Sequence, residues 1–173
     1  PIFWRGSIPC DILFIGEAPG DSEEALGVPF IGPAGHMLDE MIEEAVVMSS
    51  TEHLKLAFTN IVCCVPDGDS ERKIGQPDQD SIEMCQPRLE EFIRVCDVKD
   101  RLKLVVCVGK FAKQAVMGDD KGRRFKHNTK LPRPSIEVIW IDHPAYIGRL
   151  SITYRGVYYQ QNVVKISEAM EYL

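Results

Sequence analysis

Four short apolar runs constrain the fold of this chain more than any other feature of its sequence. They cover residues 12–15, 57–65, 104–108 and 136–141, and each has the length and the β-branched or aromatic content of a strand. Segments with a helical spacing of apolar residues separate them. Strands that alternate with helices predict parallel βαβ units. We therefore expect an α/β fold, with three αβα layers built on a central four-stranded parallel sheet.

The first predicted helix lies between the first two runs, where apolar and acidic side chains take opposite faces. Its apolar face consists of Met37, Leu38, Met41, Ile42 and Ala45. Further helices are predicted near residues 80–95, directly after Gly109, and over residues 157–173. The chain has 173 residues, of which 45% are hydrophobic, so it can bury a core of its own. We expect a single domain over residues 1–173.

The charge distribution restricts any nucleic-acid partner to a local basic patch. The net charge of −6 repels polyanions overall. One run without acidic residues carries six basic side chains: Lys121, Arg123, Arg124, Lys126, Lys130 and Arg133. Both a DNA-binding patch and a solvated loop fit such a run. No apolar run is long enough to span a membrane, and the six scattered cysteines indicate reduced thiols, so we expect a cytoplasmic, intracellular protein.

Ligands bind at the carboxyl ends of the strands in a parallel sheet, so the residues at these ends are candidates for function. Gly16 and Gly20 bound a tight turn after the first run, and Asn60 is polar within the second. His143 follows the fourth run. Phe30 is an aromatic residue in a stiff, proline-rich loop. Taken alone, Phe30, Asn60 and His143 each favour a structural role over a functional one.

Four motifs in order give a specific resemblance. They are Gly-Glu-Ala-Pro-Gly from Gly16, Pro-Phe-Ile-Gly-Pro-Ala-Gly from Pro29, Thr-Asn from Thr59 and His-Pro-Ala from His143. Together they resemble the uracil-DNA glycosylase superfamily, and most of all its family 4, the iron-sulfur type. The resemblance implies a base excision repair enzyme that hydrolyses the N-glycosidic bond of uracil in DNA and leaves an abasic site. It also implies a nucleoid-associated monomer whose partner is uracil-containing DNA and that needs no membrane.

The resemblance further implies roles for individual residues. Glu17 and His143 would be catalytic: Glu17 would position water or steady the cationic sugar, and His143 would stabilise charge on uracil O2. The uracil-binding set would be Gly16, Ala18, Gly20, Glu23, Phe30, Asn60 and His143. The Phe30 ring would stack on the base, and the amide of Asn60 would match the O4 and N3–H edge of uracil but not that of cytosine. The DNA-contacting set would be Pro144, Ala145, Tyr146, Arg149, Lys121, Arg123, Arg124 and Lys126.

The family also carries a [4Fe-4S] cluster held by four cysteines. Cys64 and Cys85 match two of the ligands. The other two form a Cys-x-x-Cys motif upstream of the first strand in the family, and this chain has no such motif. We therefore expect that an N-terminal cluster-binding segment is missing and that two cysteines upstream of this chain complete the site.

Two departures from the family bear on the reaction. Residues 71–77 resemble an insertion in related glycosylases that crosslink themselves to DNA through a histidine, but this chain has Gly75 there, so we expect turnover. Tyr146 and Ile147 stand where a leucine often wedges the duplex, which leaves the wedging side chain open. The alternatives to a uracil glycosylase are a non-catalytic or crosslinking uracil-DNA binding protein, and a glycosylase for another deaminated base such as hypoxanthine.

Overall fold

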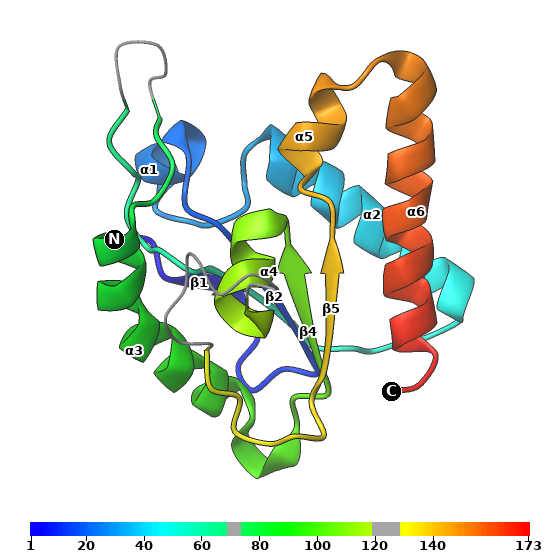
Figure 1. The fold of residues 1–173 in the computed structure, drawn as a ribbon. Coiled ribbons are helices and arrows are strands. Elements are labelled where there is room, and N and C mark those ends of the chain that lie inside the picture. The colour runs from blue at the N-terminus through cyan, green and yellow to red at the C-terminus, as the bar shows by residue number, and fades with distance from the viewer. Residues whose placement is uncertain (69–73, 119–128) are drawn as a thin grey trace.

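The computed structural model describes residues 1–68, 74–118 and 129–173, and their five strands form one sheet in the order β1-β3-β2-β4-β5 (Figure 1). In chain order the elements are β1 (Trp4–Gly6), β2 (Ile12–Gly16), α1 (Asp21–Leu26), α2 (Pro33–Ser49), β3 (Leu56–Asn60), α3 (Gln79–Cys96), the 3-10 turn η1 (Val98–Asp100), β4 (Leu104–Val108), α4 (Lys110–Met117), β5 (Glu137–Ile141), α5 (Pro144–Arg149) and α6 (Ile152–Met170).

The four predicted strands pair in parallel as β3, β2, β4 and β5, which confirms the predicted fold class. The sheet has a fifth strand that the sequence analysis missed. β1 runs antiparallel to β3, with Trp4 opposite Thr59. It is only three residues long and only partly buried, so it has no apolar run by which to recognise it. The second run was also predicted too long, because β3 ends at Asn60.

Helices cover both faces of the sheet, as the αβα prediction requires. Alternating residues of β2 point to opposite sides: Leu13 and Ile15 pack under α3 and α4, whereas Ile12 and Phe14 pack against α2 and α6. The strands β2 and β4 are therefore buried throughout. Short helices α1 and α5 were not predicted, and α6 begins earlier than expected. No helix in the described ranges has the length and apolar character needed to cross a membrane.

Two ion pairs connect loops at the amino ends of the strands, on the side of the sheet opposite the predicted site. Arg133 donates from Nε and Nη2 to the two carboxylate oxygens of Asp97, at 2.8 and 2.6 Å, and Nη2 also bonds the Leu102 carbonyl. These bonds lower the pKa of Asp97. Arg101 likewise pairs with Asp11 at 2.9 Å. The last residue of the basic run is therefore engaged in holding the loop before β4.

Candidate active site

A cavity of about 370 Å³ opens at the carboxyl ends of the strands. Its walls come from the loop after β2, the start of α2, the loop after β3 and the turn from β5 into α5. The lining residues are Glu17, Ala18, Pro19, Gly20, Glu23, Phe30, Ala34, Gly35, Asn60, Ile74, Gly75, His143, Pro144, Ala145 and Arg149. Phe30, Asn60 and His143, which are far apart in the sequence, therefore face one cavity, where the rule for parallel sheets places a ligand.

Asn60 is the last residue of β3 and is only 3% exposed. The backbone is well bonded, because Arg88 donates to its carbonyl at 2.6 Å. The side chain differs: within the described part of the chain, no group is hydrogen-bonded to its amide, which faces the cavity. Because Asn60 is otherwise buried, a ligand in the cavity would replace water as the hydrogen-bond partner of this amide. Asn60 is thus suited to read a polar edge.

Phe30 and Asn60 approach each other because two glycines make room. A Cβ on Gly16 would lie 2.5 Å from both the Asn60 Oδ1 and the Phe30 Cζ atoms, and a Cβ on Gly35 would lie 2.0 Å from the Phe30 carbonyl oxygen. Phe30 has a left-handed backbone with φ of 59°, which is unusual for an aromatic residue and is a form of strain that collects at functional sites. Gly16 does not line the cavity; it supports the residues that do.

His143 precedes α5, and its Nδ1 accepts a hydrogen bond of 3.1 Å from the Ala145 amide. Burial, with a smaller effect from nearby Arg149, lowers the pKa of His143 to about 4. The ring is therefore neutral at pH 7, and its proton lies on Nε2. Gly109 allows this placement, because it has φ of 90° and its missing Cβ would lie 2.9 Å from the His143 Cβ.

The two acids of the cavity have different surroundings. Burial raises the pKa of Glu17, whose side chain has no hydrogen bond to the described residues. Glu23 instead accepts from two loops: Oε2 from the Gly20 amide at 3.1 Å and Oε1 from the Gly32 amide at 3.0 Å. Glu23 therefore ties the loop after β2 to the loop before α2, and Glu17 is the acid left free to act on a ligand.

The long loop after β3 contributes the remaining wall. Asp67 and Ile74 form an antiparallel bridge, and the Gly75 amide donates to the Pro66 carbonyl at 3.3 Å. A Cβ on Gly75 would lie 2.0 Å from the Asp67 carbonyl oxygen, so this close approach of the two segments requires glycine. Ile74 and Gly75 line the cavity.

Comparison with known proteins identifies the family of the chain. The family model of the uracil DNA glycosylase superfamily matches residues 3–163. The chain belongs to the uracil DNA glycosylase superfamily.

Alignments with its relatives in the superfamily cover only part of this chain and part of each relative. A Type-4 uracil-DNA glycosylase of Sulfurisphaera tokodaii is 31% identical over 127 residues, which cover 73% of this chain and 52% of that protein. One from Pyrobaculum aerophilum is 26% identical over 155 residues, covering 84% and 71%. The chain spans about half the length of the first of these and of the relative from Archaeoglobus fulgidus, of which it covers 49%.

A solved structure supports the fold of this superfamily member. The crystal structure of wild-type SMUG2 from Pedobacter heparinus superposes with a TM-score of 0.51 and 12% sequence identity, covering 92% of this chain and 76% of that one. At this identity the likeness speaks for the fold alone.

The structure places Cys63 beside Cys85, and not Cys64, which was the cysteine expected there as a cluster ligand. Cys63, rather than Cys64, has its Sγ 3.8 Å from the Sγ of Cys85, and Cys64 is exposed. Among the described residues, no three His, Cys, Asp or Glu side chains are grouped to hold a metal ion. A [4Fe-4S] cluster needs four ligands. The residues present do not fit a complete cluster, so no step of the reaction below depends on one.

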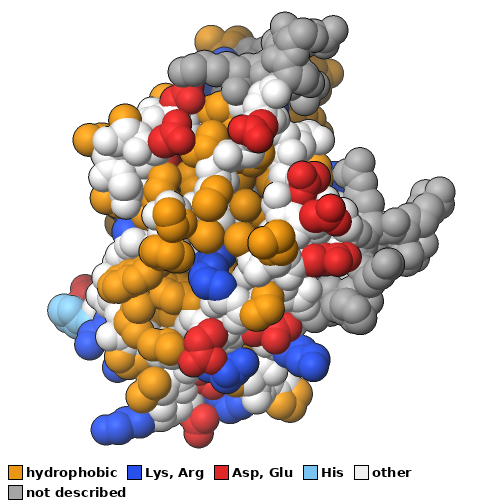
Figure 2. Space-filling view, turned by 90° about the vertical axis from the view of Figure 1, so that its left-hand side faces the viewer, with side chains coloured by type: hydrophobic (Ala, Val, Ile, Leu, Met, Phe, Trp, Pro, Cys, Tyr) orange, Lys and Arg blue, Asp and Glu red, His pale blue; other side chains and the backbone are white. Residues whose placement is uncertain are grey.

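Hydrophobic side chains gather on part of the face formed by β1 and α3 (Figure 2). Phe3, Trp4 and Met84 are 48%, 43% and 82% exposed. Trp4 packs on Phe92 of α3, with ring centroids 6.0 Å apart.

The predicted DNA-contacting residues are only partly placed by the structure. Pro144, Ala145 and Arg149 line the cavity, and Tyr146 is 42% exposed beside Tyr158. Ile147 is fully buried in the core, which leaves Tyr146 as the exposed member of the pair at the wedge position. The basic residues Lys121, Arg123, Arg124 and Lys126 lie outside the described residues.

Proposed function

We propose that this chain hydrolyses the N-glycosidic bond of uracil in DNA and thereby acts as a base excision repair glycosylase. The observation that carries the proposal is the convergence of Phe30, Asn60 and His143 on one cavity, in which the Asn60 amide has no partner among the described residues. Membership of the superfamily and the Type-4 relatives support it.

Recognition would begin when the uracil nucleotide leaves the DNA stack and enters the cavity, at a cost of about a few kcal/mol. Phe30 would stack on the base. The Asn60 amide would donate to uracil O4 and accept from N3–H. Cytosine presents a donor and an acceptor in the reverse order, so an amide held in this orientation would leave both unpaired and reject it.

Bond cleavage would draw on the neutral imidazole of His143. When the C1′–N1 bond breaks, its electron pair passes to uracil and negative charge gathers on O2. Because Nδ1 accepts from the Ala145 amide, Nε2–H is free to donate to that oxygen. A preorganised donor of this kind contributes about 2.7–4 kcal/mol to transition-state stability elsewhere.

Glu17 would act on the other side of the bond. A water oxygen would form a bond to C1′ as the C1′–N1 bond breaks, and the water proton would pass to the Glu17 carboxylate. The departing uracil anion would then take up a proton, from Glu17 or from solvent, which leaves an abasic site and neutral uracil. Of the two carboxylates that line the described cavity, Glu23 is held by two backbone amides, so Glu17 would orient the water or steady the cationic sugar. The neighbouring Ala18 offers no polar group for either task.

Glu17→Gln is expected to lower the uracil release rate by about 10²- to 10⁴-fold, the usual range for loss of a general base. Because burial raises the pKa of Glu17, activity of the parent should decline as the pH falls through that raised value. The variant should lack this acid limb. Release rates measured between pH 4 and 9 test both points, and an unchanged rate would reduce Glu17 to a structural acid.

The same variant should be more stable than the parent at pH 7.5. The folded state holds the Glu17 proton more tightly than the unfolded chain, so the charge begins to cost stability once the pH exceeds the usual value of 4.5. Glutamine carries no such charge. Thermal midpoints should therefore differ at pH 7.5 and converge below pH 4.5, where both states of the parent are protonated.

Gly16→Ala tests the cavity's shape without removing a polar group. The three atoms nearest to its Cβ would belong to the side chains of Asn60 and Phe30 and not to the backbone, so we expect these two side chains to be displaced and the fold to survive. We expect uracil release to fall by at least about tenfold. Gly156→Ala is the matched control: nothing lies within 4 Å of its added Cβ, and alanine suits the interior of α6. Equal activities of the two variants would contradict the assigned packing.

We further propose a monofunctional enzyme that turns over. The described cavity lining contains no lysine amine, the usual nucleophile for a covalent Schiff base. Gly75 occupies the wall where related crosslinking glycosylases use histidine, and glycine has no side chain to attack C1′. We propose that a monomer binds the DNA through Pro144, Ala145, Tyr146, Arg149 and the basic run, inside the cell.

A uracil-release assay on single-stranded and double-stranded DNA tests the function directly. Free uracil and an abasic product support it, whereas their absence rejects it. Tight binding of uracil-DNA without product would indicate a binding protein. Release of hypoxanthine but not uracil would indicate the other deaminated base as the substrate.

A cluster remains a separate proposal: Cys64 and Cys85 would supply two thiolates of a [4Fe-4S] cluster, and two cysteines upstream of Pro1 the others. Protein that includes such a segment, purified without oxygen, should then show iron, sulfide and visible absorption. Cys85→Ser should remove the absorption, while Cys107→Ala, at a buried site in β4, should retain it. Cys64→Ser set against Cys63→Ser decides which neighbour is the ligand.

A further inference from the structure

Arg88 connects α3 to the end of β3, directly behind the cavity. Its Nη2 donates to the Asn60 carbonyl at 2.6 Å, and its Nη1 donates to the Thr59 Oγ1 at 2.8 Å. A longer contact of 3.4 Å reaches the Ile61 carbonyl. The Thr59 hydroxyl in turn donates to the Phe3 carbonyl at 2.7 Å. One guanidinium thus holds three successive residues at the point where β3 leaves the sheet.

The strand end needs such a partner because its ladder is incomplete. On the β2 side, Asn60 lies opposite Gly16, and the next amide, of Ile61, bonds the Gly16 carbonyl at 2.9 Å. On the other side, β1 begins at Trp4, opposite Thr59, so no strand residue faces Asn60. Arg88 fills this position and satisfies a carbonyl that would otherwise be unpaired.

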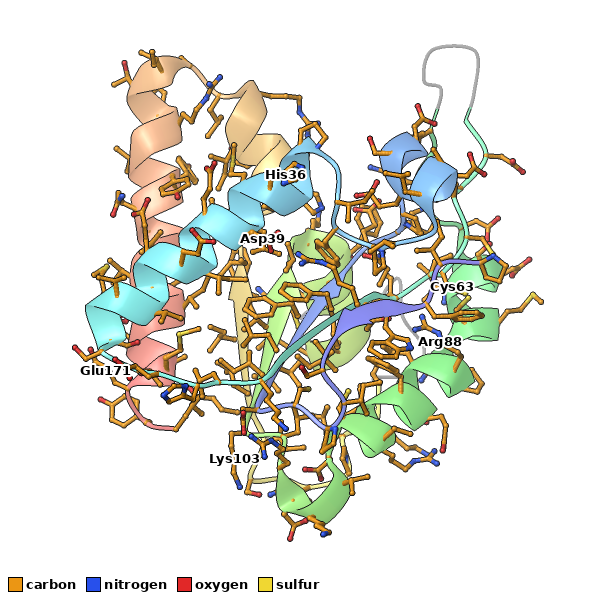
Figure 3. All side chains as sticks on the ribbon, turned by 180° about the vertical axis from the view of Figure 1, so that it is seen from behind. His36, Asp39, Cys63, Arg88, Lys103 and Glu171 are labelled. Carbon is orange, nitrogen blue, oxygen red and sulfur yellow. The ribbon has the colours of Figure 1, made fainter. Side chains whose placement is uncertain are left out.

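The placement of Arg88 is costly. Burial lowers its pKa, its Nε has no hydrogen-bond partner, and the described residues give it no carboxylate. Arg88 and Cys63 lie together between α3 and the end of β3 (Figure 3), and Cys85 lies one turn before Arg88 on the same helix. An arginine that only formed an ion pair could do so at the surface, without the cost of burial. The hydrogen bonds of Arg88 to the end of β3 therefore account for its buried position.

We infer that Arg88 is a positioning residue for base recognition, which fixes the backbone at Thr59 and Asn60 so that the Asn60 amide faces the cavity. The inference rests on the proposed function of Asn60. Two fixed donors on one planar group set the orientation of a strand end better than a single ammonium could. Arg88 touches no part of the substrate, so its effect is expected only through Asn60.

The test compares Arg88→Met and Arg88→Lys with Arg94→Met. Arg94 lies on the same helix, pairs with Glu91 at the surface and serves as the control. Binding is measured to DNA with a non-cleavable 2′-fluoro-2′-deoxyuridine and to DNA with a tetrahydrofuran abasic analogue. Both Arg88 variants should weaken binding of the first by about tenfold and leave the second within about twofold. A fold defect would weaken both. Arg88→Lys retains the positive charge, so the comparison can still be made if Arg88→Met does not fold.

A double-mutant cycle and a spectroscopic readout complete the test. In an Asn60→Ala background, Arg88→Met should cause no further loss, because the residue through which it acts is absent. In the free protein, the side-chain ¹⁵N–¹H signals of Asn60 should shift in both Arg88 variants and not in Arg94→Met. Unshifted signals, or losses that add in the cycle, overturn the inference. A parent protein that neither binds nor cleaves uracil-DNA counts against the proposed function alone, since the amide signals still report on Arg88.

Discussion

Asn60→Ala is expected to lower kcat/KM for uracil release by about two to three orders of magnitude and to remove the preference for uracil over cytosine. Asn60 is 3% exposed, and its amide faces the cavity and has no partner among the described residues, so the hydrogen bonds of the amide are available to the base. Alanine removes both the donor for O4 and the acceptor for N3–H. Competition between uracil and cytosine substrates in one reaction measures the loss of selection directly.

Two further variants sharpen this test. Gln160→Ala removes an exposed amide on α6, which bonds Glu44 at 3.3 Å, and should leave release unchanged. Asn60→Asp retains the shape but replaces the amide donor with a carboxyl group, so the ratio of uracil to cytosine release should fall. Parental selectivity in Asn60→Ala would remove the assigned role.

His143→Ala should reduce kcat by about 10²- to 10³-fold, with a much smaller change in substrate binding. The donor matters most when charge has built up on O2, which happens after the base is bound. Single-turnover rates and binding to the 2′-fluoro substrate separate the two effects. His53→Asn is the control, because the His53 side chain is 94% exposed and its left-handed backbone suits asparagine. A variant with lower affinity but an unchanged rate would contradict the role.

The low pKa of His143 makes the pH dependence informative. At about 4, against a usual 6.5, the ring stays neutral in the folded state, so the rate profile should show no inflection near pH 6.5. The unfolded chain takes up this proton first as the pH falls. Relative to His143→Ala, the parent should therefore lose about 3 kcal/mol of stability between pH 6.5 and 4. Urea unfolding at pH 7 and at pH 4.5 measures it.

The central strands could be predicted from the sequence because burial on both faces leaves a continuous apolar run. Residues 104–108 show this best: every residue of β4 is buried. β1 could not be predicted in this way, because a three-residue edge strand is specified by its pairing with β3 rather than by its own pattern. The helices α1 and α5, each six residues long, are too short to display a helical period.

In the candidate site, too, some residues could be predicted from the sequence and others could not. Residues that follow strands, such as Glu17 and His143, could be located because topology places strand ends together. The contacts that support them come from tertiary packing: Arg88 is one of many charged residues on α3 until the helix is docked against β3. The neighbouring cysteines show the same limit, since only the fold decides that Cys63 turns toward Cys85.

The carboxylate of Glu23 accepts hydrogen bonds from Gly20 in the loop after β2 and from Gly32 in the loop before α2, so the positions of the two loops depend on each other. Protein engineers who wish to alter which base this chain accepts should therefore exchange residues 16–35 as a block. Replacing only one of the two loops would remove one of the hydrogen bonds to Glu23, and the loop that was kept would then be held less firmly.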